Sequence, residues 1–70
     1  MSDDAAPTTF ADAMDWIGRR SGLYIMKVEG ERIMISVRVS GLSASETATS
    51  TDEGDLEAAL VRAIRQIAGS

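Results

Sequence analysis

The sequence contains neither cysteine nor histidine, and this absence removes most of the chemistry that small proteins use. Without cysteine there is no disulfide and no thiolate metal ligand. Without histidine there is no imidazole to act as general base, zinc ligand or pH switch. The remaining bases for a nucleophilic serine are carboxylates and Lys27, and no Gly-x-Ser-x-Gly or Ser-x-x-Lys spacing occurs. We therefore expect a protein that is not an enzyme and needs no metal or cofactor.

Positive charge and long apolar segments are also scarce. Seven basic residues against eleven acidic ones give a net charge of −4, which disfavours non-specific attraction to nucleic acid or anionic lipid. The apolar runs are only a few residues long, too short to span a membrane. The first seven residues include Asp3 and Asp4 but no basic residue, unlike a signal peptide. These features predict a cytoplasmic protein.

The length of the chain limits how much core it can form. A 70-residue chain forms one small domain, and a single core of this size rarely supplies more than ~3–5 kcal/mol of net stability. With no disulfide available, a partner chain is the remaining source of extra stability. We predict a disordered tail over residues 1–8 and a single domain over residues 9–70.

Apolar residues at helical spacing predict a first helix over about residues 9–21. Thr9 and Asp12 have the spacing of a capping box, and Gly22 is expected to end the helix in the left-handed conformation. The apolar face of this helix consists of Phe10, Ala13, Met14 and Ile17. Trp16 lies beside this stripe, where it would flank the core or serve as a binding hot spot.

A second helix is predicted over about residues 52–68. Acidic residues crowd its first turns, and Arg62 and Arg65 lie toward its end, as the helix dipole favours. Its apolar stripe consists of Leu56, Ala59, Leu60, Ala63, Ile64 and Ile67.

Between the helices, residues 23–40 predict a β-hairpin. Gly30 followed by Glu31 is typical of a two-residue type II′ turn. The register that this turn sets gives a core face with the pairs Tyr24–Val37, Met26–Ile35 and Val28–Ile33. The other face is mixed and places Leu23, Ile25 and Met34 among Lys27, Ser36 and Arg38. A slip of one residue would bury arginine and serine, so the register is strongly specified.

Residues 45–50 are compatible with a weak edge strand or with a flexible loop. Thr47 and Thr49 are β-branched and favour a strand, and a third strand would stabilise a hairpin that is marginal alone. The predicted fold class is α+β. It is an α-β-β-(β)-α two-layer sandwich with both helices on one face of a small antiparallel sheet.

The element order resembles that of the double-stranded-RNA-binding domain over about residues 9–68. In that family a lysine-rich start of the second helix grips phosphates, whereas residues 54–59 here are Gly-Asp-Leu-Glu-Ala-Ala. The loop Gly30-Glu31 is also shorter than the family's minor-groove loop. Both departures disfavour nucleic acid as a partner. A nucleic-acid-binding alternative would use Arg19, Arg20, Lys27, Arg32 and Arg38.

A second resemblance agrees better with the charge. The size, the acids over residues 52–57, Glu46 and the lack of catalytic residues resemble the small acidic phage-encoded inhibitors of CRISPR systems, the anti-CRISPR proteins. The resemblance implies a phage or mobile-element inhibitor in the host cytoplasm. It would bind a host nucleic-acid-handling protein complex through an acidic surface that imitates nucleic acid. The residues assigned to that surface are Glu46, Asp52, Glu53, Asp55 and Glu57.

Two other interpretations of these residues stay open. The acids of residues 52–57 lie where carboxylates stabilise a helix N-terminus, so they are also explained as helix caps. The apolar residues of the outer sheet face, Leu23, Ile25 and Met34, would form a patch of the kind that marks an interface. A small assembly subunit that forms a homodimer through this face is therefore a third hypothesis.

Overall fold

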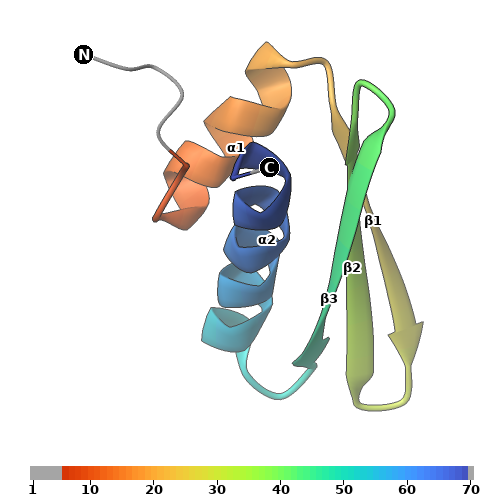
Figure 1. The fold of residues 1–70 in the computed structure, drawn as a ribbon. Helices are drawn as coiled ribbons and strands as arrows, with labels where there is room; N and C mark the ends of the chain where they lie inside the picture. The colour runs from red at the N-terminus through yellow and green to blue at the C-terminus, as the bar shows by residue number, and fades with distance from the viewer. Residues whose placement is uncertain (1–5, 70) are drawn as a thin grey trace.

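The computed structural model describes residues 6–69, and its fold is the predicted α+β two-layer sandwich. The elements are α1 (Phe10–Arg19), β1 (Leu23–Glu29), β2 (Arg32–Val39), β3 (Leu42–Thr49) and α2 (Glu53–Ala68). The strands form one antiparallel sheet in the order β1-β2-β3. Both helices lie on the same side of this sheet (Figure 1). The third strand is confirmed and is longer than predicted.

Two tight turns set the register of the sheet. Gly30 has a φ of 61° and Glu31 does not share a positive φ, as a type II′ turn requires. The pairs of β1 with β2 are the predicted ones, from Leu23 opposite Arg38 to Glu29 opposite Arg32. Between β2 and β3, Ser40 and Gly41 both have positive φ, at 48° and 83°, as in a type I′ turn.

The ends of α1 differ in how well the sequence predicted them. Thr9 caps the helix as expected, and its Oγ1 accepts a hydrogen bond from the Asp12 backbone N–H at 3.2 Å. The left-handed residue after the helix is Ser21, with a φ of 52°, and not Gly22 as predicted. Glycine is needed at position 22 for space, because a Cβ there would lie 2.2 Å from Val39 Cγ1.

The predicted tail and domain limits are only partly within the described residues. Residues 1–5 and 70 lie outside the described part of the chain. Within the predicted tail, Pro7 is buried, and its carbonyl accepts a hydrogen bond from Arg65 Nη1 at 3.2 Å. The chain immediately before α1 therefore contacts α2.

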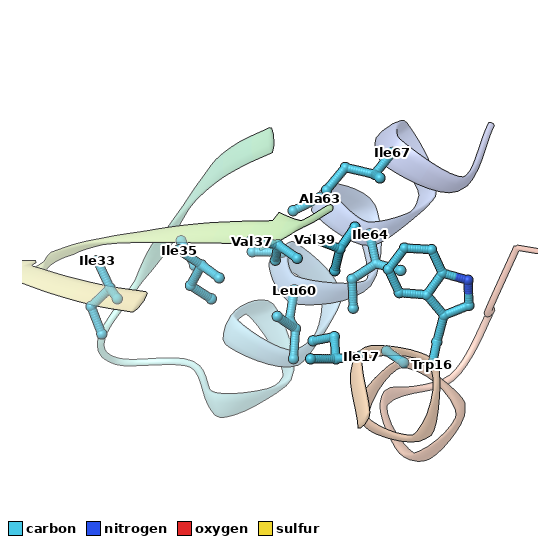
Figure 2. Packing of buried hydrophobic residues seen from close by; sticks show 13 residues of the cluster. Trp16, Ile17, Ile33, Ile35, Val37, Val39, Leu60, Ala63, Ile64 and Ile67 are labelled. Carbon is cyan, nitrogen blue, oxygen red and sulfur yellow. The ribbon is translucent and has the colours of Figure 1, made fainter. Parts of the chain in front are cut away.

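The core lies between the two helices and the sheet, where β2 supplies most of the strand residues and β3 supplies Ala48 (Figure 2). Its members are Ala13, Trp16, Ile17, Ile33, Ile35, Val37, Val39, Ala48, Ala59, Leu60, Ala63, Ile64 and Ile67. Trp16 is a core residue with 7% exposure, whereas Phe10, predicted on the buried stripe, is 38% exposed. The buried face of α1 is thus rotated toward Trp16, whose large ring gains more from burial.

Candidate functional site: the open edge of the sheet

Strand β1 forms one edge of the sheet and contributes nothing to the core. All seven of its residues are exposed. Five of them are large and apolar, with exposures of 50% for Leu23, 41% for Tyr24, 53% for Ile25, 48% for Met26 and 61% for Val28. We call these five side chains the edge patch. Their side chains point alternately to the two faces of the sheet, so no element of residues 6–69 covers either face of β1.

The edge patch corrects the prediction for one face of the hairpin. Tyr24, Met26 and Val28 lie opposite buried residues of β2, on the side of the sheet that faces the helices, as predicted. They are nevertheless exposed, because α2 packs on β3 and β2 and leaves β1 outside. An apolar pattern assigns a residue to a face of the sheet, but it does not say how far across that face a helix extends.

The side chains of β3 explain why α2 lies where it does. Ala44 and Ala48 are the β3 neighbours of Val37 and Ile33 on the helix side of the sheet. Their small side chains allow a helix to approach closely, and Ala48 is only 3% exposed. The corresponding neighbours on β1 are the bulky Tyr24 and Val28.

The backbone of β1 also presents unpaired groups at its outer edge. Ser50 N–H donates to the Glu31 carbonyl at 2.7 Å. Hydrogen-bonded pairs alternate along an antiparallel ladder, so the odd-numbered residues of β2 form their backbone hydrogen bonds with β3. Even-numbered residues of β2 then bond to the odd-numbered residues of β1. The N–H and C=O groups of Tyr24, Met26 and Val28 therefore point away from the sheet.

An apolar groove adjoins the edge patch on the helix side. It lies between the start of α1, strand β1 and the first turns of α2, and its lining includes Phe10, Tyr24, Met26, Ile35, Leu56 and Leu60. Glu53 and Glu57 also line it. Within residues 6–69, neither carboxylate has an ion-pair or hydrogen-bond partner.

The other acids of the predicted acidic surface make bonds within the chain. Glu46 contacts α2, through an ion pair with Arg62 at 3.5 Å and a hydrogen bond from Gln66. Asp52 Oδ1 accepts the Gly54 N–H at 3.0 Å, as the helix-cap interpretation expects. Asp55 Oδ2 accepts the Thr49 N–H at 2.9 Å. Within residues 6–69, Glu53 and Glu57 are thus the only two of the five acids without a bonding partner, and both lie at the groove.

The basic residues of the nucleic-acid alternative are divided between the two layers. On α1, Arg19 pairs with Asp15 at 2.9 Å. Arg20 lies over the Trp16 ring, 4.2 Å from its centroid, and donates to the Trp16 carbonyl. Neither is available without breaking a contact within the helix.

The remaining three basic residues share the sheet face away from the helices, which we call the open face. Lys27 pairs there with Glu29 at 3.1 Å. In the described part of the chain, Arg32 and Arg38 have no ion-pair partner. The predicted apolar residues Leu23, Ile25 and Met34 lie on the same face and are exposed.

The three-stranded sheet, the two helices on one side of it and the site at its edge define the chain as a small α-β-β-β-α two-layer sandwich, with an apolar edge strand that no element of residues 6–69 covers. Comparisons with protein-family models, with curated proteins and with solved structures each found no match. Within residues 6–69, no helix is long and apolar enough to cross a membrane.

Proposed function

We propose that this chain is a non-catalytic protein-binding module and that its contact surface is the edge patch together with the adjoining groove. The observation that carries the proposal is the exposure of every residue of β1, an apolar strand with a free backbone edge. Folded proteins usually protect such edges with charges, proline, bulges or a covering element. On β1 the charged residues are Lys27 and Glu29, both on the open face and paired with each other, so Tyr24, Met26 and Val28 on the helix side have no charge among them. Contiguous exposed apolar patches mark interaction sites.

The mode of binding that this surface supports is addition of a strand from a partner. A partner strand would pair with the outward backbone groups of Tyr24, Met26 and Val28. Its side chains would then cover the edge patch on both faces. Main-chain hydrogen bonds supply affinity in such complexes, and the pockets beside the edge supply specificity.

The two free carboxylates of the groove add a charge preference. Glu53 and Glu57 border an apolar lining, so they favour a partner segment that combines apolar residues with lysine or arginine. This preference agrees with the narrower proposal that the chain inhibits a host nucleic-acid-handling complex, since such complexes present basic surfaces. Within that proposal, Glu53 and Glu57 are better contact residues than Glu46, Asp52 and Asp55, which bond within the chain.

Site-directed photo-crosslinking in the native cell tests the proposal. A photoreactive residue replaces Tyr24 in one variant and Thr47 of β3 in a matched control, because both lie on outer strands of the same sheet. We expect a discrete cross-linked protein from position 24, lost when Met26→Lys is added, and little product from position 47. Equal products from both positions, or none from position 24, would overturn the proposal.

The charge preference has its own test. The double reversal Glu53→Lys with Glu57→Lys is expected to reduce the cross-linked product from position 24, because it removes the free carboxylates without touching the core. The control reversal is Glu31→Lys, an exposed acid of the β1–β2 turn that does not line the groove. Equal products from both variants would show that charge at the groove does not matter.

A second candidate function is binding of nucleic acid by the open face. The observation that favours it is that Arg32 and Arg38 lie on this face and have no ion-pair partner within residues 6–69. A gel-shift assay with duplex RNA and DNA at low salt tests it, because phosphate contacts weaken as salt rises. Salt-sensitive binding that Arg32→Glu with Arg38→Glu abolishes would place this function above the first.

A further inference from the structure

We propose that the partner of β1 is a second copy of this chain, paired antiparallel through β1 to give a continuous six-stranded sheet. This inference rests on the proposed function, in which the edge patch is a contact surface, and it names the occupant. The two-fold axis passes between the two Met26 residues, perpendicular to the sheet. The helices of both copies then lie on the same side.

The positions of the outward backbone groups select this register. Tyr24, Met26 and Val28 are spaced evenly about Met26, so an antiparallel copy places Met26 opposite the partner's Met26 and Tyr24 opposite the partner's Val28. Every outward N–H and C=O of β1 then finds a partner. A shift by two residues in either direction leaves at least one of these three residues of each copy without its pair.

The side chains also match in this register. Directly opposite residues of an antiparallel pair point to the same face, so Tyr24, Met26 and Val28 of both copies meet on the helix side, beside the groove. On the open face, Ile25 lies opposite the partner's Lys27. Lys27 keeps its ion pair with Glu29 of its own strand, which limits repulsion between the two copies.

The opposite edge of the sheet explains why the assembly would close as a dimer. On β3, the Asp55 carboxylate already accepts the outward Thr49 N–H, and apart from Leu42 at its start the strand carries only small or polar side chains. Each chain therefore has one open apolar edge, and an interface that uses the same patch on both copies closes after two subunits. A dimer would also give a small core the added stability that no disulfide supplies.

Sedimentation of the full chain between about 1 µM and about 1 mM tests the proposal. We expect a monomer–dimer equilibrium whose dissociation constant rises at least about tenfold in Met26→Lys. The control Thr47→Lys places the same charge on the other edge and is expected to leave the equilibrium unchanged. Equal weakening by both variants, or weakening by Met34→Lys of the open face in place of Met26→Lys, would overturn the strand-pairing arrangement.

Single cysteines test the register directly, because the chain has none of its own. The opposed Met26 Cα atoms would lie about 5.5 Å apart, within the range of a disulfide. We expect Met26→Cys to form a covalent dimer on mild oxidation. Tyr24→Cys and Val28→Cys should cross-link when mixed but not separately, since two Tyr24 residues would be about 13 Å apart along the strand.

The outcomes separate this inference from the proposed function. A strict monomer at every concentration would overturn the second copy as occupant. Photo-crosslinking from Tyr24 to a different protein would then still support the proposed function. Failure of any product from Tyr24 in cells, together with a monomer in solution, would overturn both.

Discussion

The two edges of this sheet are built in opposite ways. On β1 the residues that face the helix side are Tyr24, Met26 and Val28, and all three are exposed. On β3 the corresponding residues are Ala44, Glu46 and Ala48, and α2 packs over them. Among residues 6–69, one edge has large apolar side chains and no covering element, and the other has two alanines and a glutamate beneath a helix.

The difference shows that large apolar side chains on a strand do not by themselves determine where a helix packs on the sheet. A helix packs closely where the side chains below it are small, and α2 follows the alanines of β3. Polar contacts then hold it there, since Glu46 pairs with Arg62 and Asp55 accepts the Thr49 N–H. The bulky residues of β1 are left exposed. Four pairs of substitutions test this comparison, in order of expected effect.

The largest contrast is between the centre of the sheet and its open edge. Ile35→Ala removes a side chain that is 2% exposed and should cost about 2–5 kcal/mol of unfolding free energy. Met26→Ala, directly opposite on β1, should cost less than about 1 kcal/mol, because Met26 is half exposed in the monomer. Urea unfolding at low protein concentration measures both. Equal losses would mean that β1 is covered in the isolated chain.

The next contrast enlarges one side chain on β1 and one on β3, at positions that lie in the same row across the sheet. Ala48 and Val28 flank Ile33 from opposite sides. Ala48→Leu should destabilise the fold by about 1–3 kcal/mol, since it forces α2 away from β3, whereas Val28→Leu should be within about 0.5 kcal/mol of the parent. Thermal unfolding followed by circular dichroism distinguishes them. A tolerated Ala48→Leu would argue against close packing of α2 on β3.

The attachment of β1 to the rest of the fold is tested at Gly22. Gly22→Ala introduces a Cβ that would lie 2.2 Å from Val39 Cγ1 and 3.1 Å from the Arg38 carbonyl. We expect a loss of about 1–3 kcal/mol from overpacking. The control is Gly18→Ala in α1, where a Cβ meets nothing within 4 Å and helix propensity should improve. If Gly22→Ala were as stable as Gly18→Ala, the close approach would not exist in solution.

The smallest contrast concerns Asp55, the acid whose side chain accepts a backbone N–H at the β3 edge. Asp55→Asn weakens the bond from the Thr49 N–H and removes a charge from the first turn of α2. The expected cost is about 0.5–2 kcal/mol. Glu57→Gln, which also removes one charge from α2 but breaks no bond within residues 6–69, should change stability by less than about 0.5 kcal/mol. Chemical denaturation compares the two, and equal effects would assign the role of Asp55 to charge alone.

Much of the fold could be predicted from local signals. The Gly30-Glu31 turn fixed the β1–β2 register, and Thr9 was correctly predicted as the cap of α1. These features depend on a few adjacent residues, so sequence patterns carry them. The prediction for Gly22 was wrong in its reason, because the contact with Val39 comes from a distant strand.

The candidate site was harder to predict because it depends on what the helices leave uncovered. Leu23, Ile25 and Met34 were predicted on the outer face, where they lie. The exposure of Tyr24, Met26 and Val28 was missed, since the apolar pattern of β1 is the same whether or not a helix covers it. The available signal was the size contrast between these residues and the alanines of β3. The bonds of Glu46 and Asp55 within the chain depend on tertiary contacts that no local pattern reveals.

The charges of the open face affect how the molecule is oriented when it approaches another charged molecule. That face carries Lys27, Arg32 and Arg38 with Glu29 as its acid, although the chain as a whole has a net charge of −4. The domain is therefore an electric dipole whose positive end points out through the strands. Such a field orients a charged molecule that comes within roughly 8 Å of the surface, which is the screening length at physiological salt. In the proposed dimer the two-fold axis runs along this dipole, so the dipole moments of the two copies add. The open faces of both copies, six strands in all, would then face an anionic surface together.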